Sequence, residues 1–378
     1  MSTPSQQELS LDRTIARIDK QFNVVRLLTP TNLHSEQAKF LAGEIENPRF
    51  TYRSPGSNLH LLVAELDRLH FPKTFVGRLL YRKAQETQDK LRMLMAIGTE
   101  QFSQLAKKIY GVPDATIIKD AHELMRTTNP LQPKSDFKQP RLTSNAVAAD
   151  LRDILHQYGL DDWRVQLTTD IISGVIVAAS QKTVYVHAHT SLELTRLAPI
   201  ITHEIETHVL TTVNGAAQPL ELFVQGFAGY TRTQEGLASY NVEWRHPELF
   251  HRPARFWSRN ALAVDVSLRG SFRDVFSEMQ RLGFNPHFSY GVAAKVKRGL
   301  TETDKPGGFT KDYLYLAGRR DIMNYVATGG DLRDLYVGKI LLSDLPELKK
   351  EPWLVPPKTL PNFLRGSYRP MESVTVSR

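Results

Sequence analysis

The sequence predicts an α+β protein that is mostly helical and carries one small antiparallel sheet. Apolar residues recur at helical spacing through most of the first 160 residues, change to short β-branched runs between about Trp163 and His187, and then return to helical spacing. A chain of 378 residues is long enough for two lobes that share an interface. We therefore expect a helical N-terminal lobe over residues 1–140 and a second lobe, with the sheet and a helical C-terminal part, over residues 141–378.

Two long helical patterns predict the N-terminal lobe. The stretch "NLHLLVAELDRLHF" places Leu59, Leu62 and Val63 at helical spacing, and "FVGRLLYRKAQETQDKLRMLMAIG" continues this spacing over several turns. A break at "GVPDAT" and three prolines in "TTNPLQPKSDFKQPRLT" indicate a long connection after these helices. A helix over "SNAVAADLRDILHQYG" should follow and end near Gly159.

The runs "WRVQLTT", "GVIVAAS" and "TVYVHA" predict the strands of the antiparallel sheet. The spacing of Thr190 to Glu193 resembles a capping box, so we expect the chain to return to helix at this point. Pro199 fits the first position of a new helix that runs to about Val213 and ends at Asn214-Gly215. A small sheet should thus lead directly into this helix.

Composition limits the possible functions. The chain has no cysteine, which excludes disulfides and thiolate metal sites, so a bound metal would need histidine and carboxylate ligands. The net charge of +8 is compatible with an acidic peptide, anionic lipid or nucleic acid as partner. No apolar run is long enough to span a bilayer, and "MSTPSQQELSLDRT" lacks the apolar core of a secretory signal. We expect a cytoplasmic protein that does not enter membranes.

The stretch "ITHEIETHVLTTVNG", residues 201–215, holds His203, Glu204 and His208. Zinc peptidases often carry the pattern H-E-x-x-H, and here one additional residue separates the histidines. On an ideal α-helix, residues five apart differ by about 140° in direction and would not converge on one ion. A π-type turn, which absorbs one extra residue and is frequent at functional sites, would bring the two imidazoles together.

Catalytic zinc generally has three protein ligands, so a third one is needed. Glu235 lies in "GFAGYTRTQEGLASYNVEW", where we expect Thr233 to cap a second helix and Gly236 to allow another backbone to approach closely. Other candidate ligands nearby are Glu221, Glu243 and His246. Without a metal, the histidines would be ordinary helix residues and Glu235 a helix-start carboxylate that is stabilised by the helix dipole.

Six motifs carry a resemblance to a known family. "HEIETH", "NGAAQPL", "GFAGY" and "QEGLA" occur in this order, together with "PRFTY" at residues 48–52 and "DKPGGFTKDYLYLAG" at residues 304–318. In these motifs the chain resembles the QEGLA-motif zinc metallopeptidases, which are related to the microtubule-associated tyrosine carboxypeptidases. The resemblance implies a zincin-like catalytic lobe over residues 141–378 and one Zn²⁺ per chain. It assigns His203, His208 and Glu235 as ligands and Glu204 as the catalytic carboxylate.

One position departs from this pattern. Relatives often carry glycine where this chain has Glu206, and glycine would ease an irregular helical turn. We interpret Glu206 as a solvated side chain, because charged helix positions are mostly exposed, in preference to an acceptor for a histidine N–H.

The resemblance further implies removal of a C-terminal residue, tyrosine or another aromatic, from a peptide or protein tail. Zinc-activated water would attack with Glu204 as general base, and Tyr315 is a candidate donor to the oxyanion, unless it is a buried structural tyrosine. Arg298 and Lys311 are candidates for binding the terminal carboxylate, unless they are simply solvated.

The expected partner is an acidic tail, tubulin-like if the host has microtubules, and nucleic acid is the less favoured partner. The alternatives are a zinc endopeptidase or aminopeptidase, or a non-catalytic basic binding protein with a structural metal site.

Overall fold

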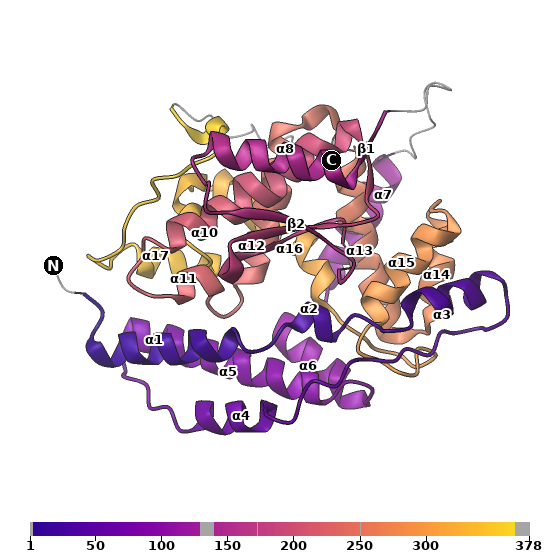
Figure 1. Cartoon of the computed structure of the whole chain (residues 1–378), viewed down its shortest axis with the longest axis horizontal. Helices are drawn as coiled ribbons and strands as arrows, with labels where there is room; N and C mark the ends of the chain where they lie inside the picture. Colours follow the sequence, from indigo (N-terminus) through magenta and orange to yellow (C-terminus); the bar gives the residue numbers. More distant parts are fainter. Residues whose placement is uncertain (1–2, 129–139, 172, 250, 367–378) are drawn as a thin grey trace.

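The computed structural model describes residues 3–128, 140–171, 173–249 and 251–366. Helices dominate it and the strands are few and short, as expected for a mostly helical α+β protein (Figure 1). The N-terminal helices are α1 (Gln6–Asp19), α2 (Val24–Leu27), α3 (Leu33–Leu41), α4 (Leu59–Asp67), α5 (Phe75–Met95), α6 (Glu100–Tyr110) and α7 (Ala115–Thr127). Both long helical patterns of the sequence are therefore helices, α4 and α5. The connection expected around residues 127–143 lies largely outside the described residues.

In Figure 1, α1, α4, α5 and α6 form a layer below the rest of the molecule. A buried ionic cluster connects this layer internally and to the helices above it. The fully buried Lys83 of α5 lies 3.2 Å from Asp19 of α1, and Lys90 lies 2.6 Å from Glu86. Glu86 also accepts a 2.7 Å hydrogen bond from the N–H of Gly229, the residue directly before helix α12 (Tyr230–Arg245). Since each buried cation has a carboxylate within reach, the cluster fixes the layer against the upper helices.

The strands form two small sheets. β1 (Arg141–Thr143) pairs with β5 (Ser191–Glu193), and β2 (Arg164–Thr168), β3 (Val175–Ala178) and β4 (Thr183–His187) form a sheet in the order β2-β4-β3. β3 and β4 are antiparallel, but β2 and β4 are parallel, so the prediction of a purely antiparallel sheet is wrong. The chain passes from β2 to the far edge before it returns to the centre. Strand alternation cannot reveal this order, because it reports only which face of each strand is buried.

Helix α8 (Ser144–Gln157) precedes the sheet and ends near Gly159, which has φ +69°, as the sequence predicts. The predicted capping box at Thr190 is wrong, because Glu193 belongs to β5. The helix after the sheet begins at Leu197, so Pro199 is its third residue and not its first. It continues as α9 (Leu197–Ile200), η3 (Ile201–Val209) and α10 (Leu210–Gly215), and its end agrees with the prediction.

The remaining helices are α11 (Leu222–Gln225), α12 (Tyr230–Arg245), α13 (His251–Arg269), α14 (Phe272–Arg281), α15 (Pro286–Lys297), α16 (Leu314–Ala327) and α17 (Leu345–Leu348). Short 3₁₀ turns are η1 (Ala179–Gln181), η2 (Leu194–Arg196), η4 (Pro247–Leu249), η5 (Lys311–Tyr313), η6 (Leu332–Tyr336), η7 (Leu342–Asp344) and η8 (Asn362–Leu364). Within the described ranges, no helix is both long and apolar enough to cross a membrane.

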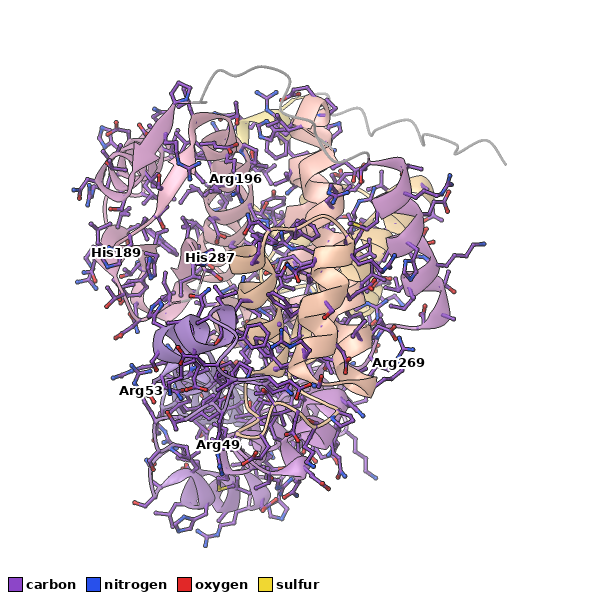
Figure 2. The ribbon with its side chains drawn as sticks, turned by 90° about the vertical axis from the view of Figure 1, so that its right-hand side faces the viewer. Arg49, Arg53, His189, Arg196, Arg269 and His287 are labelled. Atoms are coloured by element: carbon purple, nitrogen blue, oxygen red, sulfur yellow. The ribbon has the colours of Figure 1, made fainter. Side chains whose placement is uncertain are left out.

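Two apolar clusters hold these elements together. The larger one joins the N-terminal helices to the sheet, to η3 and to the segment after α16, and the smaller one lies among α3, α7 and α13 to α16. Both draw residues from each side of position 140. The motif "PRFTY" also connects the two halves of the chain. Phe50 donates a backbone hydrogen bond to the carbonyl of Thr301 (3.1 Å), and Arg49, labelled in the lower part of Figure 2, pairs with Glu302 at 2.7 Å.

Candidate metal centre

The segment that carries the two histidines is a π-helix, η3, over nine residues. In a π-helix the backbone hydrogen bond joins residues five apart, so it brings His203 and His208 to one face, as an α-helix does for residues four apart. Their rings lie 4.9 Å apart, centroid to centroid. The structure therefore contains the widened helix that the five-residue spacing requires, and it extends beyond a single turn.

Buried side chains hold the widened helix in place. Thr207 donates a 2.8 Å hydrogen bond to the carbonyl of Thr202, five residues earlier. Asn241 of α12 donates to the hydroxyl oxygens of Thr207 and Tyr336, at 2.9 Å each. The side chains of Thr207, Asn241 and Tyr336 are all buried, so the hydrogen bonds among them favour one geometry of the helix. No sequence signal points to Asn241, because a buried asparagine has no periodic pattern.

Glu235 lies in the second turn of α12, which begins after Gly229, so the prediction that Thr233 caps this helix is wrong. The Thr233 hydroxyl instead accepts a 2.8 Å hydrogen bond from the N–H of Leu342. The expected close approach at Gly236 is confirmed. A Cβ atom on Gly236 would lie 2.3 Å from the carbonyl carbon of Gly318 in α16. This contact brings the start of α16 beside Glu235.

The three expected ligands converge. The ligand atoms of His203, His208 and Glu235 all lie within 4.8 Å of one another. Oε2 of Glu235 is 3.6 Å from Nε2 of His203 and 3.7 Å from Nε2 of His208. These separations are close to those of two ligands on one tetrahedral zinc ion, which are about 3.4 Å for bonds of about 2.0–2.1 Å.

A second observation fits a metal at this position. Oε2 of Glu235 is buried and has no hydrogen-bond partner in the described part of the chain, although a buried unpaired carboxylate oxygen is costly. A cation between this oxygen and the two imidazoles would satisfy it. Nδ1 of His208 lies 3.4 Å from Oε1 of Gln234, a contact that leaves Nε2 free to bind a metal.

Lys311 lies at the same site, because its Nζ atom is 3.1 Å from Oε1 of Glu235. Burial alone would raise the pKa of Glu235, but Lys311 and the two imidazoles outweigh it and hold this pKa well below its usual range. Glu235 is therefore ionised, as a metal ligand must be. In this structure Lys311 is thus already paired with a protein carboxylate.

Glu204 directly follows His203 in η3 and lies within electrostatic reach of both imidazoles and of Glu235. Burial raises its pKa, and the neighbouring imidazoles oppose that rise. Among the described residues its carboxylate has no hydrogen-bond or ion-pair partner. A half-buried carboxylate of raised pKa beside a metal site is suited to accept and return a proton.

Tyr315, at the start of α16, stacks on His203 with ring centroids 6.2 Å apart. Phe256 contacts the same tyrosine ring edge-on at 5.3 Å. Burial, followed by the charges of Glu235 and Asp312, raises the pKa of Tyr315 well above its usual value, so its hydroxyl keeps its proton. No described residue accepts a hydrogen bond from this hydroxyl.

The other candidate residues lie elsewhere. Arg298 is buried, with its Nη2 atom 3.5 Å from Asp312 and its guanidinium 4.5 Å from the centroid of the Phe309 ring. Of the competing ligands, Glu243 forms a bidentate pair with Arg319, Glu221 pairs with Lys20, and His246 lies beside Thr202. None of these three belongs to the metal-ligand group found in the described residues.

The interpretation of Glu206 as a solvated side chain is wrong. Its carboxylate accepts a 2.8 Å hydrogen bond from the Tyr158 hydroxyl and a 2.9 Å bond from the Thr202 hydroxyl. Nε2 of His246 lies 3.0 Å from the same Thr202 hydroxyl. Glu206 thus connects the widened helix to α8, through a tyrosine that lies 48 positions away in sequence.

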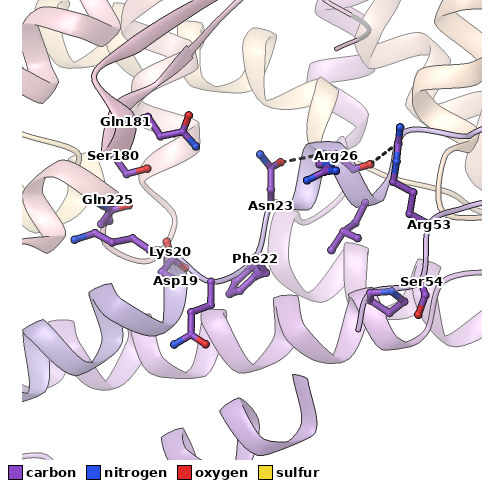
Figure 3. Close-up of a pocket in the computed structure, with 13 residues that line it drawn as sticks. Asp19, Lys20, Phe22, Asn23, Arg26, Arg53, Ser54, Ser180, Gln181 and Gln225 are labelled. Atoms are coloured by element: carbon purple, nitrogen blue, oxygen red, sulfur yellow. Dashed lines mark hydrogen bonds between the residues drawn. The ribbon is translucent and has the colours of Figure 1, made fainter. Parts of the chain in front are cut away.

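A cavity of about 430 Å³ opens where the end of α1 and α2 face the turn between β3 and β4. Figure 3 shows Arg26 and Arg53 on one side of it and Gln181, Gln225 and Lys20 on the other. The lining has three cations and one carboxylate, Asp19. It is therefore a basic depression in the surface.

Comparison with known proteins identifies the family. The family described as microtubule-associated tyrosine carboxypeptidase matches residues 38–377, which is most of the chain. The chain belongs to this family. The resemblance read from the motifs is thereby confirmed.

Individual members of the tyrosine carboxypeptidase family are distant relatives. Human (Homo sapiens) microtubule-associated tyrosine carboxypeptidase 1 is 30% identical over 193 residues, which are 49% of this chain and 40% of the human protein. The mouse (Mus musculus) protein of the same name is 29% identical over 214 residues, which are 54% of this chain and 44% of the mouse protein. The matched region thus spans less than half the length of these relatives.

Proposed function

We propose that this protein is a zinc metallocarboxypeptidase that removes a C-terminal residue, tyrosine or another aromatic, from a peptide or protein tail. The observation that carries the proposal is the convergence of His203, His208 and Glu235, with an unpaired Glu235 oxygen, beside the unpartnered carboxylate of Glu204. Membership of a family named for tyrosine carboxypeptidases supports the choice of peptide end. A small sheet followed by the ligand helix is also consistent with a zincin-like arrangement.

A bound zinc would polarise the scissile carbonyl and make water more acidic. In the reaction that we infer, Glu204 takes a proton from the attacking water and later gives it to the leaving amine as the peptide bond breaks. Its raised pKa suits a group that must hold a proton between these two steps. Tyr315, protonated and without a partner for its hydroxyl among the described residues, donates to the oxyanion that develops on the carbonyl.

Recognition of a chain end requires a cation for the terminal carboxylate. Lys311 and Arg298 are the cations first proposed for this role, and both lie near Tyr315 or Glu235. The name of the relatives suggests a microtubule partner, and tubulin-like acidic tails are the substrate class that we propose. The basic lining of the cavity at Arg26 and Arg53 supports an acidic tail. Such a substrate would place the enzyme in the cytoplasm.

Mass spectrometry of peptide mixtures tests this proposal. Peptides that end in Tyr, Phe, Leu or Glu, each as the free acid and as the C-terminal amide, are incubated with the zinc-loaded protein, with chelator-treated protein and with Glu204→Gln. We expect loss of one C-terminal aromatic residue from free acids by the zinc-loaded protein alone. A rate drop of about 10² to 10⁴ is expected for Glu204→Gln.

The alternatives give different products. Cleavage of amidated peptides as fast as free acids would contradict a carboxypeptidase and favour an endopeptidase. Loss of N-terminal residues would indicate an aminopeptidase. Binding of acidic peptides with equal affinity by wild type and Glu204→Gln, with no cleavage by either, would favour a binding protein with a structural metal.

A further inference from the structure

The terminal carboxylate of the substrate needs a cation that is not already neutralised. Lys311 pairs with Glu235 at 3.1 Å, and Arg298 lies 3.5 Å from Asp312. To take a substrate carboxylate, each would have to share its charge with a protein carboxylate that is already bound. A third cation lies near the same site, and the role inferred for it rests on the proposed function.

Arg259, on α13, is held between aromatic rings. Its guanidinium carbon lies 4.5 Å from the centroid of Phe256 and 4.2 Å from that of Phe288, with Phe284 at 5.7 Å. Its hydrogen-bond partner is the side-chain oxygen of the adjacent Asn260, at 3.4 Å, and no carboxylate of the described residues pairs with it. Stacking on ring faces orients the planar guanidinium but uses none of its N–H donors.

Ring contacts connect Arg259 to the metal centre. Phe256, which carries the guanidinium, packs edge-on against Tyr315 at 5.3 Å, and Tyr315 stacks on the ligand His203 at 6.2 Å. The arginine is therefore three successive ring contacts from the first metal ligand. A peptide with its scissile carbonyl at the metal has its terminal carboxylate only a few ångströms further along the chain.

The surroundings of Arg259 carry an excess of positive charge. Burial lowers the pKa of Arg259 to about 9 and that of Lys295, on α15, to about 8. Lys295 has no ion-pair or hydrogen-bond partner among the described residues, and Nε of Arg298 is buried without an acceptor. Asp312 is the carboxylate that acts on this group of three cations, and Arg298 already pairs with it. A bound anion would offset the cost of burying these cations.

We propose that Arg259, stacked between Phe256 and Phe288, binds the α-carboxylate of the C-terminal residue of the substrate and so makes the enzyme specific for chain ends. The planar guanidinium suits a two-point contact with a carboxylate. Lys295 adds positive charge beside it. Arg259 thus determines which peptide bond reaches Glu204, and takes no part in the proton transfer.

The test measures peptide binding in a variant that cannot complete catalysis. Zinc-loaded Glu204→Gln is titrated by calorimetry with one acidic hexapeptide that ends in Tyr, as the free acid and as the C-terminal amide. The same pair is titrated against Glu204→Gln combined with Arg259→Gln, with Arg259→Lys, and with Arg269→Gln as the control. Arg269 lies on the same helix and is paired with Asp265. Arg196 is a neighbour of Arg259, and Figure 2 shows Arg269 far from Arg196.

We expect the background protein to prefer the free acid, and Arg259→Gln to reduce this preference by about 10- to 100-fold, as expected for loss of a charge-assisted pair. Arg259→Lys keeps the charge but loses the planar fork, so it should retain part of the preference. If Arg259→Gln does not fold, Arg259→Lys alone shows whether the guanidinium determines the preference for the free acid. Arg269→Gln should keep the full preference.

The inference is overturned if both Arg259 variants, folded and zinc-loaded, keep the full preference for the free acid. It is also overturned if the background protein binds both peptides equally. Hydrolysis is not part of this measurement. Failure of wild type to cleave any peptide would therefore remove the proposed activity, while the dependence of free-acid binding on Arg259 would still decide the inference.

Discussion

Replacement of Gly236 by alanine should force α12 away from α16. The added Cβ atom would lie 2.3 Å from the carbonyl carbon of Gly318 and 2.4 Å from its oxygen, whereas ordinary contacts begin at 3.4 Å. Both neighbours are backbone atoms, so no side chain can rotate away and the helices must separate by about 1 Å. We expect a loss of about 3 kcal/mol in the free energy of unfolding, the upper end for overpacking a core.

The same displacement should impair the site, because α16 carries Tyr315 and η5 carries Lys311 beside Glu235. Urea midpoints followed by tryptophan fluorescence measure the stability, and kcat/KM on a confirmed peptide measures the site. Gly291→Ala in α15 is the matched control: an added Cβ there meets nothing within 4 Å. It should be neutral or gain up to about 1 kcal/mol. Equal urea midpoints for the two variants would show that α12 and α16 accommodate the added Cβ atom without separating.

Three further predictions concern polar side chains whose hydrogen bonds join distant parts of the chain. Asn241→Ala should cost about 2 kcal/mol and weaken zinc binding about 10-fold, because Thr207 loses the donor that fixes the widened helix; unchanged competition with a chelator would contradict this. Burial raises the pKa of Asp12 from 3.8 to about 6, so the folded chain binds this proton more tightly than the unfolded chain. Between about pH 4 and pH 6, wild type should therefore lose about 2–3 kcal/mol relative to Asp12→Asn as the pH rises, and a pH-independent difference in urea midpoints would disprove it. Glu206→Gln and Tyr158→Phe should each cost about 1 kcal/mol, and the double variant should cost less than their sum; strict additivity would mean that the 2.8 Å hydrogen bond contributes nothing.

Local features of the fold followed from the sequence because each depends on neighbouring residues. The helices around Leu59 and Phe75, the strand positions and the helix end at Gly215 all follow from spacing and from turn residues. The five-residue interval between His203 and His208 required a widened helix if both were to bind one ion, and the structure contains one. The close approach at Gly236 followed from the absence of a side chain.

Features that depend on contacts between residues far apart in the chain could not be predicted from the sequence. Glu206 was expected in solvent, but its acceptor role depends on Tyr158, which the fold brings from α8. Strand order depends on which strands pair, and the central β4 pairs with β2, which lies earlier in the chain, as well as with the adjacent β3. The cap of α12 is Gly229, which has φ +73° and donates its N–H to Glu86, far away in sequence. Spacing along the chain contains no information about such contacts.

The proposed activity depends on one zinc ion held by His203, His208 and Glu235. Crystals of the protein, purified without chelator and supplied with zinc, allow the metal to be located by anomalous diffraction at the zinc edge. We expect one strong peak per chain, bonded to Nε2 of both histidines and to Oε2 of Glu235, and no peak at this position in His208→Ala. Absence of bound zinc, or zinc bound at Glu243 or His246 instead, would rule out this ligand set.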